Sequence, residues 1–203
     1  MKGRVKYVVL LLFAVAAVIA GAAYVRLRGF SAREEPSRVE AFIARRLRRL
    51  ATPGGARELP NPVKVSSEVL STAMEHFADH CSFCHANDGS GTTAIGKGLY
   101  PKPPDMRLAA TQDLSDGELF YIIQNGVRFT GMPAFGNPDG SHDEDSWKLV
   151  HFIRHLPQIT NEELERMKAM NPKSPADLKE EEEIQKFLEG NDTEPSSESH
   201  KHH

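Results

Sequence analysis

The chain has 203 residues, enough for one ordinary domain with appendages, and its 39% hydrophobic content is sufficient for a core. Residues 1–65 carry 13 Lys/Arg against 4 Asp/Glu, whereas residues 66–159 and 160–203 each carry 6 against 12. A nucleic-acid-binding protein usually places its basic residues on the folded domain. Here they surround a hydrophobic segment, so we expect a membrane and no nucleic acid as a partner.

That segment, YVVLLLFAVAAVIAGAAYV, covers residues 7–25 and contains no charge. Basic residues flank it on both sides: Lys2, Arg4, Lys6, Arg26 and Arg28. Its length favours an uncleaved membrane-spanning anchor within residues 1–28. The alternative is a signal peptide cleaved near Ala20-Gly21-Ala22. Either reading exports the rest of the chain, but positive residues on both flanks leave the orientation open.

Residues 29–65 are predicted to form a basic amphipathic helix followed by a Pro/Gly linker. The helix, SRVEAFIARRLRRL, covers residues 37–50. Its apolar residues have helical spacing: Val39, Phe42, Ile43, Leu47 and Leu50. Arginines occupy much of the remaining surface. This helix is either a solvated spacer or a helix lying on anionic lipid or an acidic partner. The prolines and glycines of residues 52–62 predict the linker.

Residues 66–157 are predicted to form the main domain. Apolar residues from Leu70 to Cys81 recur with helical spacing and predict a helix that runs into the cysteines. A polar loop at 87–93 follows, and the three prolines within residues 100–106 exclude a helix there.

The second half of this domain holds two more predicted helices. One opens at Ser115 with Glu118 in a capping-box pattern and closes at Asn125-Gly126. Another covers residues 144–155 and is stopped by Pro157. Since no stretch alternates with period two, the fold class is expected to be all-α.

Residues 158–190 are predicted to form a charged helical extension. Thr160 with Glu163 opens one short helix, and residues 176–188 form another. Residues 191–203 are expected to be a disordered His-rich tail. Three histidines within it are candidates for a weak transition-metal site: His200, His202 and His203.

Both cysteines of the chain lie in CSFCH, residues 81–85. A redox-active dithiol would need a neighbouring βαβ pattern, which is absent from the sequence. A structural zinc site needs four ligands, and no second cysteine pair exists. His76 and His80 are the candidates that would complete such a site.

The third interpretation of CSFCH is covalent haem attachment, for which Cys-x-x-Cys-His is the recognised signal. The sulfurs of Cys81 and Cys84 would add to the two vinyl groups of the macrocycle, because two intervening residues let one turn of chain span that distance. His85 would then lie under the iron as the proximal ligand. We therefore predict one covalent haem c.

The remaining axial position of the iron requires a second ligand, and Met132 is the predicted one. It lies in Gly131-Met132-Pro133, where glycine permits close backbone approach and proline restrains the preceding residue. Met106, which follows the proline run, is the alternative. Met132 could instead be apolar filling in a turn.

These features together resemble a class I c-type cytochrome, of the monohaem, bacterial and membrane-anchored kind. The resemblance covers residues 66–157 and includes CSFCH, the Pro-rich loop, GMP about 47 residues after the histidine, and the helix SWKLVHFIRHL. It implies that the first and last helices cross, with haem between them. It also implies that the carbonyl of Pro101 or Pro103 accepts a hydrogen bond from His85.

The resemblance further suggests side chains around the haem. Six residues are candidates either for haem contact or for core packing: Phe83, Leu99, Tyr100, Phe129, Phe135 and Trp147. Together with Pro101 and Pro103, we select Tyr100, Phe135 and Trp147 as haem contacts. Three basic residues could either meet the propionates or be surface charges: Lys97, Arg107 and Arg128.

His/Met ligation leaves neither haem face open to substrate and favours the ferrous state, so the expected function is single-electron transfer without bond chemistry. Candidate partners are a quinol-oxidising complex, a terminal oxidase, or a dehydrogenase of which this chain is the cytochrome subunit. A haem peroxidase and a haem-based sensor are the alternatives. The resemblance places thioether attachment on the exported side, so we expect a single-pass protein of the cell membrane with its haem domain in the periplasm.

Overall fold

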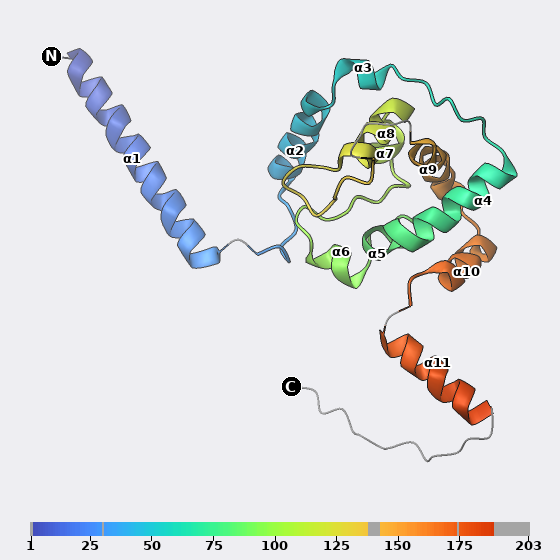
Figure 1. The fold of residues 1–203 in the computed structure, drawn as a ribbon. Helices are drawn as coiled ribbons and strands as arrows, with labels where there is room; N and C mark the ends of the chain where they lie inside the picture. Colours follow the sequence, from blue (N-terminus) through green and yellow to red (C-terminus); the bar gives the residue numbers. More distant parts are fainter. Residues whose placement is uncertain (1, 30, 138–142, 174, 189–203) are drawn as a thin grey trace.

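The computed structural model describes residues 2–29, 31–137, 143–173 and 175–188, and these residues form helices and no strands (Figure 1). The predicted all-α class is therefore confirmed. The elements are α1 (Lys2–Arg28), α2 (Arg38–Ala51), α3 (Gly54–Arg57), α4 (Ser67–His76), the π-helical turn η1 (Phe77–Cys81), α5 (Ser82–His85), α6 (Ala94–Gly98), α7 (Ala109–Gln112), α8 (Asp116–Asn125), α9 (Glu144–His155), the 3₁₀ turn η2 (Leu156–Gln158), α10 (Asn161–Met170) and α11 (Pro175–Leu188).

Helix α1 stands apart from the domain as a single straight rod (Figure 1). Residues Arg4–Leu27 are long and apolar enough to cross a membrane, and none of them is buried in the protein. An exposed apolar helix of this length is what the sequence predicted for a membrane anchor.

Helix α4 carries the chain directly into the cysteine motif, as predicted. Ser66 begins it, because its hydroxyl accepts a hydrogen bond from the backbone N–H of Val69. One π-helical turn, η1, then leads into α5, which ends at His85. The sequence did not predict this turn, a feature that is frequent at functional sites.

The core lies where α4 and α9 pack together in the most extensive helix–helix interface of the described elements. The rings of Phe77 and Phe152 meet there with centroids 5.1 Å apart. Helix α8 packs on the other side of α9, where Phe120 stacks on Trp147 at 4.0 Å. The predicted pairing of the first and last helices of the domain is thus present.

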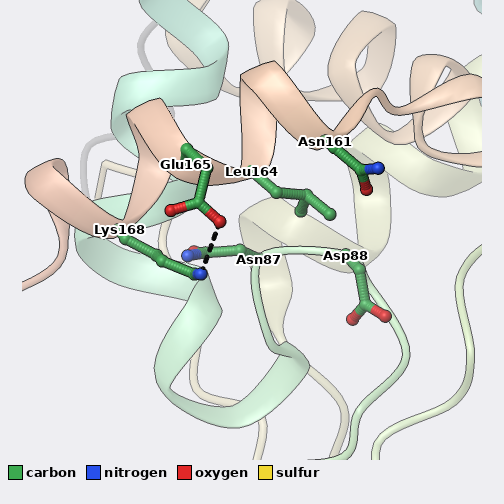
Figure 2. A pocket seen from close by; sticks show the side chains of 6 residues that line it. All are labelled: Asn87, Asp88, Asn161, Leu164, Glu165 and Lys168. Carbon is green, nitrogen blue, oxygen red and sulfur yellow. Dashed lines mark hydrogen bonds and ion pairs between the residues drawn. The ribbon is translucent and has the colours of Figure 1, made fainter.

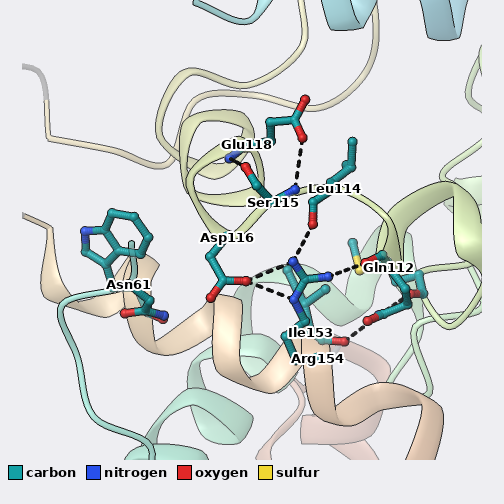
Figure 3. A network of polar contacts seen from close by, with 10 residues as sticks. Asn61, Gln112, Leu114, Ser115, Asp116, Glu118, Ile153 and Arg154 are labelled. Carbon is teal, nitrogen blue, oxygen red and sulfur yellow. Dashed lines mark hydrogen bonds and ion pairs between the residues drawn. The ribbon is translucent and has the colours of Figure 1, made fainter. Parts of the chain in front are cut away.

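A polar network joins α9 to the segment between α7 and α8 (Figure 3). The guanidinium of Arg154 binds the Asp116 carboxylate at 2.8 Å and donates to the carbonyls of Gln112, at 2.6 Å, and Leu114. The Gln112 amide in turn donates to the carbonyl of Ile153 at 2.9 Å. The carbonyls of Gln112 and Leu114, which form no helical hydrogen bond, are therefore both bound by the guanidinium of Arg154.

Residues 52–62, predicted as a linker, pack against the domain together with Val63. The carbonyl of Ala56 lies so close to Gly117 at the start of α8 that a Cβ there would collide with it. The side-chain amide of Asn61 donates to the Trp147 carbonyl at 3.0 Å, and His151 contacts the Val63 carbonyl at 2.7 Å. This stretch therefore contacts both the start of α8 and the helix α9.

The C-terminal extension begins as predicted, with the Thr160/Glu163 capping box opening α10. Met167 of α10 is 0% exposed and joins the cluster that contains Phe77. The hydrophobic core therefore continues beyond residue 157. Helix α11 matches the second predicted helix of the extension. The candidate metal-binding histidines of the tail, His200, His202 and His203, lie outside the described residues.

Candidate haem site

The two cysteines occupy successive turns at the end of the first domain helix. Cys81 ends η1, Cys84 lies in α5, and both are free thiols. Burial, with a smaller contribution from Cys84, raises the pKa of Cys81 to about 12, and burial also raises the pKa of Cys84. Reactive dithiols need the opposite, a lowered thiol pKa. A thioether carries neither charge nor proton, so it tolerates this environment.

His85 directly follows them and is 8% exposed. Burial lowers its pKa to about 4, so the ring is neutral at physiological pH, the form that binds metal. Its Nδ1 is buried without a hydrogen-bond partner. The hydrogen bond that His85 was expected to donate to the carbonyl of Pro101 or Pro103 is therefore not formed in this structure. A buried neutral imidazole with an orphaned polar atom fits a ring whose environment is completed by haem.

The loop after His85 brings the proline segment to the motif. The backbone N–H of Gly91 donates to the His85 carbonyl at 2.8 Å. Gly91 has a φ of +73°, and a Cβ on it would lie 2.5 Å from the Pro103 carbonyl oxygen. Only glycine fits both requirements. Gly91 thus lies between the carbonyl of Pro103 and His85, and the Pro103 carbonyl does not bond to the His85 ring.

The loop that carries Met132 is fixed to the end of α8. Val127 donates its backbone N–H to the Met132 carbonyl at 3.1 Å, and Phe135 donates to the Ile123 carbonyl at 3.0 Å. A Cβ on Gly131 would lie 2.6 Å from the Leu99 side chain, so this loop also touches the residue that follows α6. Met132 is partly exposed, whereas Met106 is buried in the core.

The candidate contact residues divide into two groups. Trp147 is buried in the core against Phe120, so core packing accounts for it, and its haem contact stays a prediction. Most of the others are not core residues, and Phe129 is 93% exposed. Exposed together with it are Phe83, Tyr100 and Phe135. A large apolar macrocycle is a ligand suited to cover such side chains.

Among the three basic candidates for the propionates, Arg107 is already engaged. Its guanidinium binds the Asp105 carboxylate in bidentate fashion, at 2.9 and 2.7 Å, and Asp88 at 3.0 Å. Asp105 follows the prolines and Asp88 follows the motif, so this pair joins the two loops. Lys97 and Arg128 are exposed.

Two surface pockets lie beside the motif. The larger, about 400 Å³, lies between α10 and the residues just after His85, and most of the residues that line it are polar or charged (Figure 2). Its lining consists of Asn87, Asp88, Asn161, Leu164, Glu165 and Lys168, none of which was predicted to contact haem. The smaller, about 310 Å³, includes Phe83 and Ile95 in its wall.

The zinc alternative receives no support from the part of the chain that the structure describes. No group of three or more His, Cys, Asp or Glu side chains in it could hold a metal ion. His76 and His80 contact each other edge to face at 4.8 Å, and His80 also pairs with Asp79 at 3.2 Å. These histidines therefore do not complete a four-ligand site with the cysteines.

An all-α domain whose first helix ends in Cys-x-x-Cys-His, with a glycine-bounded methionine loop after its penultimate helix, is that of a c-type cytochrome. In agreement, residues 69–153 match the family model described as cytochrome c oxidase, cbb3-type, subunit III. This match indicates a c-type cytochrome domain, consistent with a monohaem class I cytochrome c and with one covalent haem c. No curated protein matches the chain.

The sequence did not reveal the glycines that shape the site. Gly96 of α6 is buried, and a Cβ on it would lie 2.7 Å from the Cys84 carbonyl oxygen. With Gly91, it lets three backbone segments meet at the motif. The signal was present as the G-x-G-x-x-x-x-G spacing of residues 89–96, but only the tertiary contact explains it.

Proposed function

We propose that this chain is a membrane-anchored carrier of single electrons. Cys81 and Cys84 would hold the haem through thioethers, and His85 and Met132 would supply the two protein ligands of its iron. The observation that carries the proposal is the neutral, buried imidazole of His85, with an unpartnered Nδ1, directly after two free thiols. Haem c, when bound, takes up and gives off one electron at its iron.

The proposed ligands favour electron transfer over catalysis. With His85 on one face and Met132 on the other, no axial position remains for a substrate. Leu99 and the backbone bonds to α8 restrain the Met132 loop, so little reorganisation is required between the two oxidation states. Electrons would pass through the haem edge, near the exposed aromatic residues Tyr100, Phe129 and Phe135.

The proposed location is the periplasmic face of the cell membrane, with α1 as a single-pass anchor. Support comes from the exposed apolar stretch of α1, which is long enough to span a bilayer. Anchoring would confine the domain to the membrane surface and raise its effective concentration toward membrane-bound partners. Those partners are a quinol-oxidising complex as donor and a terminal oxidase as acceptor.

A second candidate is a permanent cytochrome subunit of a larger oxidoreductase, either an oxidase or a dehydrogenase. The matching family model is named for a subunit of a cytochrome c oxidase, which favours this candidate. A carrier and a subunit have the same haem chemistry and differ in how long they remain bound to the partner.

Haem attachment and ligation are tested on the purified full chain. Haem should stay with the denatured polypeptide on a gel, and should be lost when Cys81 and Cys84 are both replaced by alanine. An oxidised spectrum with the long-wavelength band of methionine–iron ligation is expected. Haem extracted by acid–acetone, or a high-spin spectrum, would contradict the proposed site.

The carrier function is tested in membranes. Quinol should reduce the bound haem, and oxygen should reoxidise it when a terminal oxidase is present. Mild detergent then distinguishes the two candidates, because a carrier migrates alone on a native gel whereas a subunit migrates with the oxidoreductase. Haem that neither quinol nor oxygen affects would exclude both partners.

A further inference from the structure

Helix α2 has an apolar stripe that the rest of the protein leaves uncovered. Its members lie on one side of the helix and range from 49% exposed at Ile43 to 81% at Leu50; they are Val39, Phe42, Ile43, Leu47 and Leu50. No residue of α2 is buried. Since α2 lies beside a domain with a well-packed core, its apolar stripe faces away from that domain.

The opposite side of α2 is attached to the domain. Arg48 donates to the carbonyl of Ala110 at 3.4 Å, and the Thr52 hydroxyl at the C-terminal end donates to the Arg48 carbonyl at 3.0 Å. At the other end, the Glu40 carboxylate lies beside the Tyr100 hydroxyl. The helix is thus held with one face on the domain, while the side chains of its apolar stripe are exposed. Figure 1 shows α2 at the edge of the domain, next to α3.

Arginines border the apolar stripe. Arg46 lies over the ring of Phe42, with its guanidinium carbon 5.2 Å from the ring centroid. Arg45 and Arg49 lie on the flank, and Glu40 is the sole acidic residue of α2. An apolar stripe with long basic side chains along one flank is typical of a helix that lies in the surface of an anionic bilayer, because the aliphatic stems pack in the lipid while the charges reach the head groups.

The short connection between α1 and α2 favours a lipid bilayer over an acidic protein as the binding partner of this surface. Helix α1 ends at Arg28 and α2 begins at Arg38. Residues 29–37 can span at most about 30 Å when fully extended. If α1 crosses the membrane, α2 must therefore remain close to the bilayer, where anionic head groups are present at high local concentration.

We propose that α2 lies in the interface of an anionic bilayer, with its apolar stripe among the acyl chains and its arginines at the head groups. The proposal rests on the membrane anchoring proposed above, and adds a second membrane contact to it. Anionic phospholipid is the ligand, bound through the arginines by charge and through the stripe by apolar burial.

This contact would also orient the haem domain. Tyr100 lies beside α2, and Lys102 donates to the carbonyl of Ala32 at 2.9 Å, so the proline segment faces the same side as α2. Leu99 precedes Tyr100 and contacts Gly131 in the Met132 loop. A bilayer bound at α2 therefore holds the methionine side of the site toward the membrane, where membrane-embedded redox partners lie.

The test uses the full-length holoprotein in vesicles of equal parts phosphatidylcholine and phosphatidylglycerol. Because haem attachment consumes both native thiols, a nitroxide can be placed on a single introduced cysteine. Phe42→Cys and Leu47→Cys report on the stripe, and Glu165→Cys, on the exposed face of α10, is the control. We expect the first two labels to collide more with oxygen than with a water-soluble nickel complex, and the third to show the reverse.

Replacing arginines tests the role of charge. Each basic residue near an anionic surface changes partitioning about fivefold, so R45Q/R46Q/R49Q should reduce lipid insertion of the stripe labels about a hundredfold. Arg48 is kept because it contacts the domain. K168Q/K179Q/K186Q removes the same charge from the C-terminal helices and should change nothing. Vesicles of phosphatidylcholine alone should reproduce the effect of the arginine replacements.

Three results would overturn the proposal. Stripe labels that are as accessible to nickel as Glu165→Cys, in protein that floats with the vesicles, would contradict it while leaving the anchoring by α1 intact. Inserted labels that do not respond to lipid charge or to R45Q/R46Q/R49Q would contradict the anionic ligand. Protein that fails to float would contradict both the anchoring and the α2 contact.

Discussion

Gly96 lies so close to Cys84 that a Cβ on the glycine would be 2.7 Å from the cysteine carbonyl oxygen. The same Cβ would lie 2.5 Å from the carbonyl oxygen of Gly91, whose N–H is bonded to His85. Helix α6 therefore packs backbone to backbone on the haem-attachment motif. Since its C-terminal neighbour Leu99 contacts the Met132 loop, this contact links the two proposed ligands.

We predict that Gly96→Ala destabilises the holoprotein by about 1–3 kcal/mol, the usual range for overpacking. The two nearest atoms belong to the backbone, which cannot move aside as a flexible side chain would. Denaturant unfolding, followed by the haem spectrum and by helical circular dichroism, measures the change in the free energy of unfolding.

Gly98→Ala in the same helix is the matched control, because nothing lies within 4 Å of a Cβ at that position. It should be neutral or stabilise slightly, by about 0.5 kcal/mol, through the lower entropy of the unfolded chain. Equal effects at the two glycines would show that close packing on Cys84 is unimportant.

Met132→Ala should open one axial position of the haem iron. The expected results are loss of the methionine–iron absorption band, a lower reduction potential, and binding of carbon monoxide by the reduced protein. Redox titration and optical spectra measure all three.

Met106→Ala separates ligation from packing. Met106 is buried in the core, so its truncation should cost about 2–5 kcal/mol of stability and leave the spectrum unchanged. If Met106→Ala opens the iron and Met132→Ala does not, the ligand assignment is wrong.

Local signals in the sequence predicted the limits of the longer helices, but not the short helices α3, α6 and α7. Ser115 with Glu118 forms the expected capping box of α8, and Gly126 ends that helix with a φ of +64°. The predicted limits of the helix at residues 144–155 coincide with α9. These elements were predictable because caps and apolar periodicity act over three or four neighbouring residues.

Contacts between distant segments were not predictable. The apolar character of Phe129 favours burial but does not say against what, and the side chain is exposed. Met167 was expected in a charged extension and lies fully in the core. Ala56 was placed in a linker and packs against Gly117. Each outcome depends on tertiary packing that a local pattern does not encode.

The candidate site shows the same division. Cys81, Cys84 and His85 were predicted from five consecutive letters, because the chemistry of haem attachment fixes their spacing, and their roles stay predictions. Met132 was chosen from its flanking glycine and proline, and its role stays a prediction. The expected partner of His85 among the prolines is not bonded to the ring, since the proline carbonyl lies against Gly91 instead.

Asp105→Asn should change how stability depends on pH. The hydrogen bond from Arg107 lowers the pKa of the Asp105 carboxyl in the folded protein. A lowered folded pKa stabilises the protein above the unfolded value of about 4, and this contribution disappears as the pH falls through the folded pKa. The variant should lose about 1 kcal/mol at neutral pH, because the pair is partly exposed.

Unfolding free energies of the two proteins, compared between neutral pH and about pH 2, test this prediction. The difference between them should shrink on acidification, and this difference cancels any effect of acid on the haem itself. Glu165→Gln is the control, because the Glu165–Lys168 pair is mostly exposed and contributes little. A difference that stays constant with pH would show that the Asp105 charge is not involved.

Arg154 is expected to contribute more than any exposed ion pair, because it also satisfies backbone carbonyls. Its fork binds Asp116 and the carbonyls of Gln112 and Leu114, which no helix bonds (Figure 3). Arg154→Lys keeps the charge but loses the planar fork, so at least one carbonyl is left unpaired.

We expect Arg154→Lys to lower the free energy of unfolding by about 2 kcal/mol, the usual cost of a partly buried polar group without its partner. Lys148→Gln, on the same helix, removes a cation whose partners Glu144 and Asp145 are exposed, and should cost less than about 0.5 kcal/mol. Denaturant unfolding of both variants measures the contrast. Because the network joins α9 to α7–α8, hydrogen exchange in Arg154→Lys should increase first in residues 109–118. A loss in Arg154→Lys as small as that in Lys148→Gln would show that the charge of Arg154, which lysine retains, is sufficient. A larger loss confined to Arg154→Lys, with early exchange in residues 109–118, follows from the fork geometry.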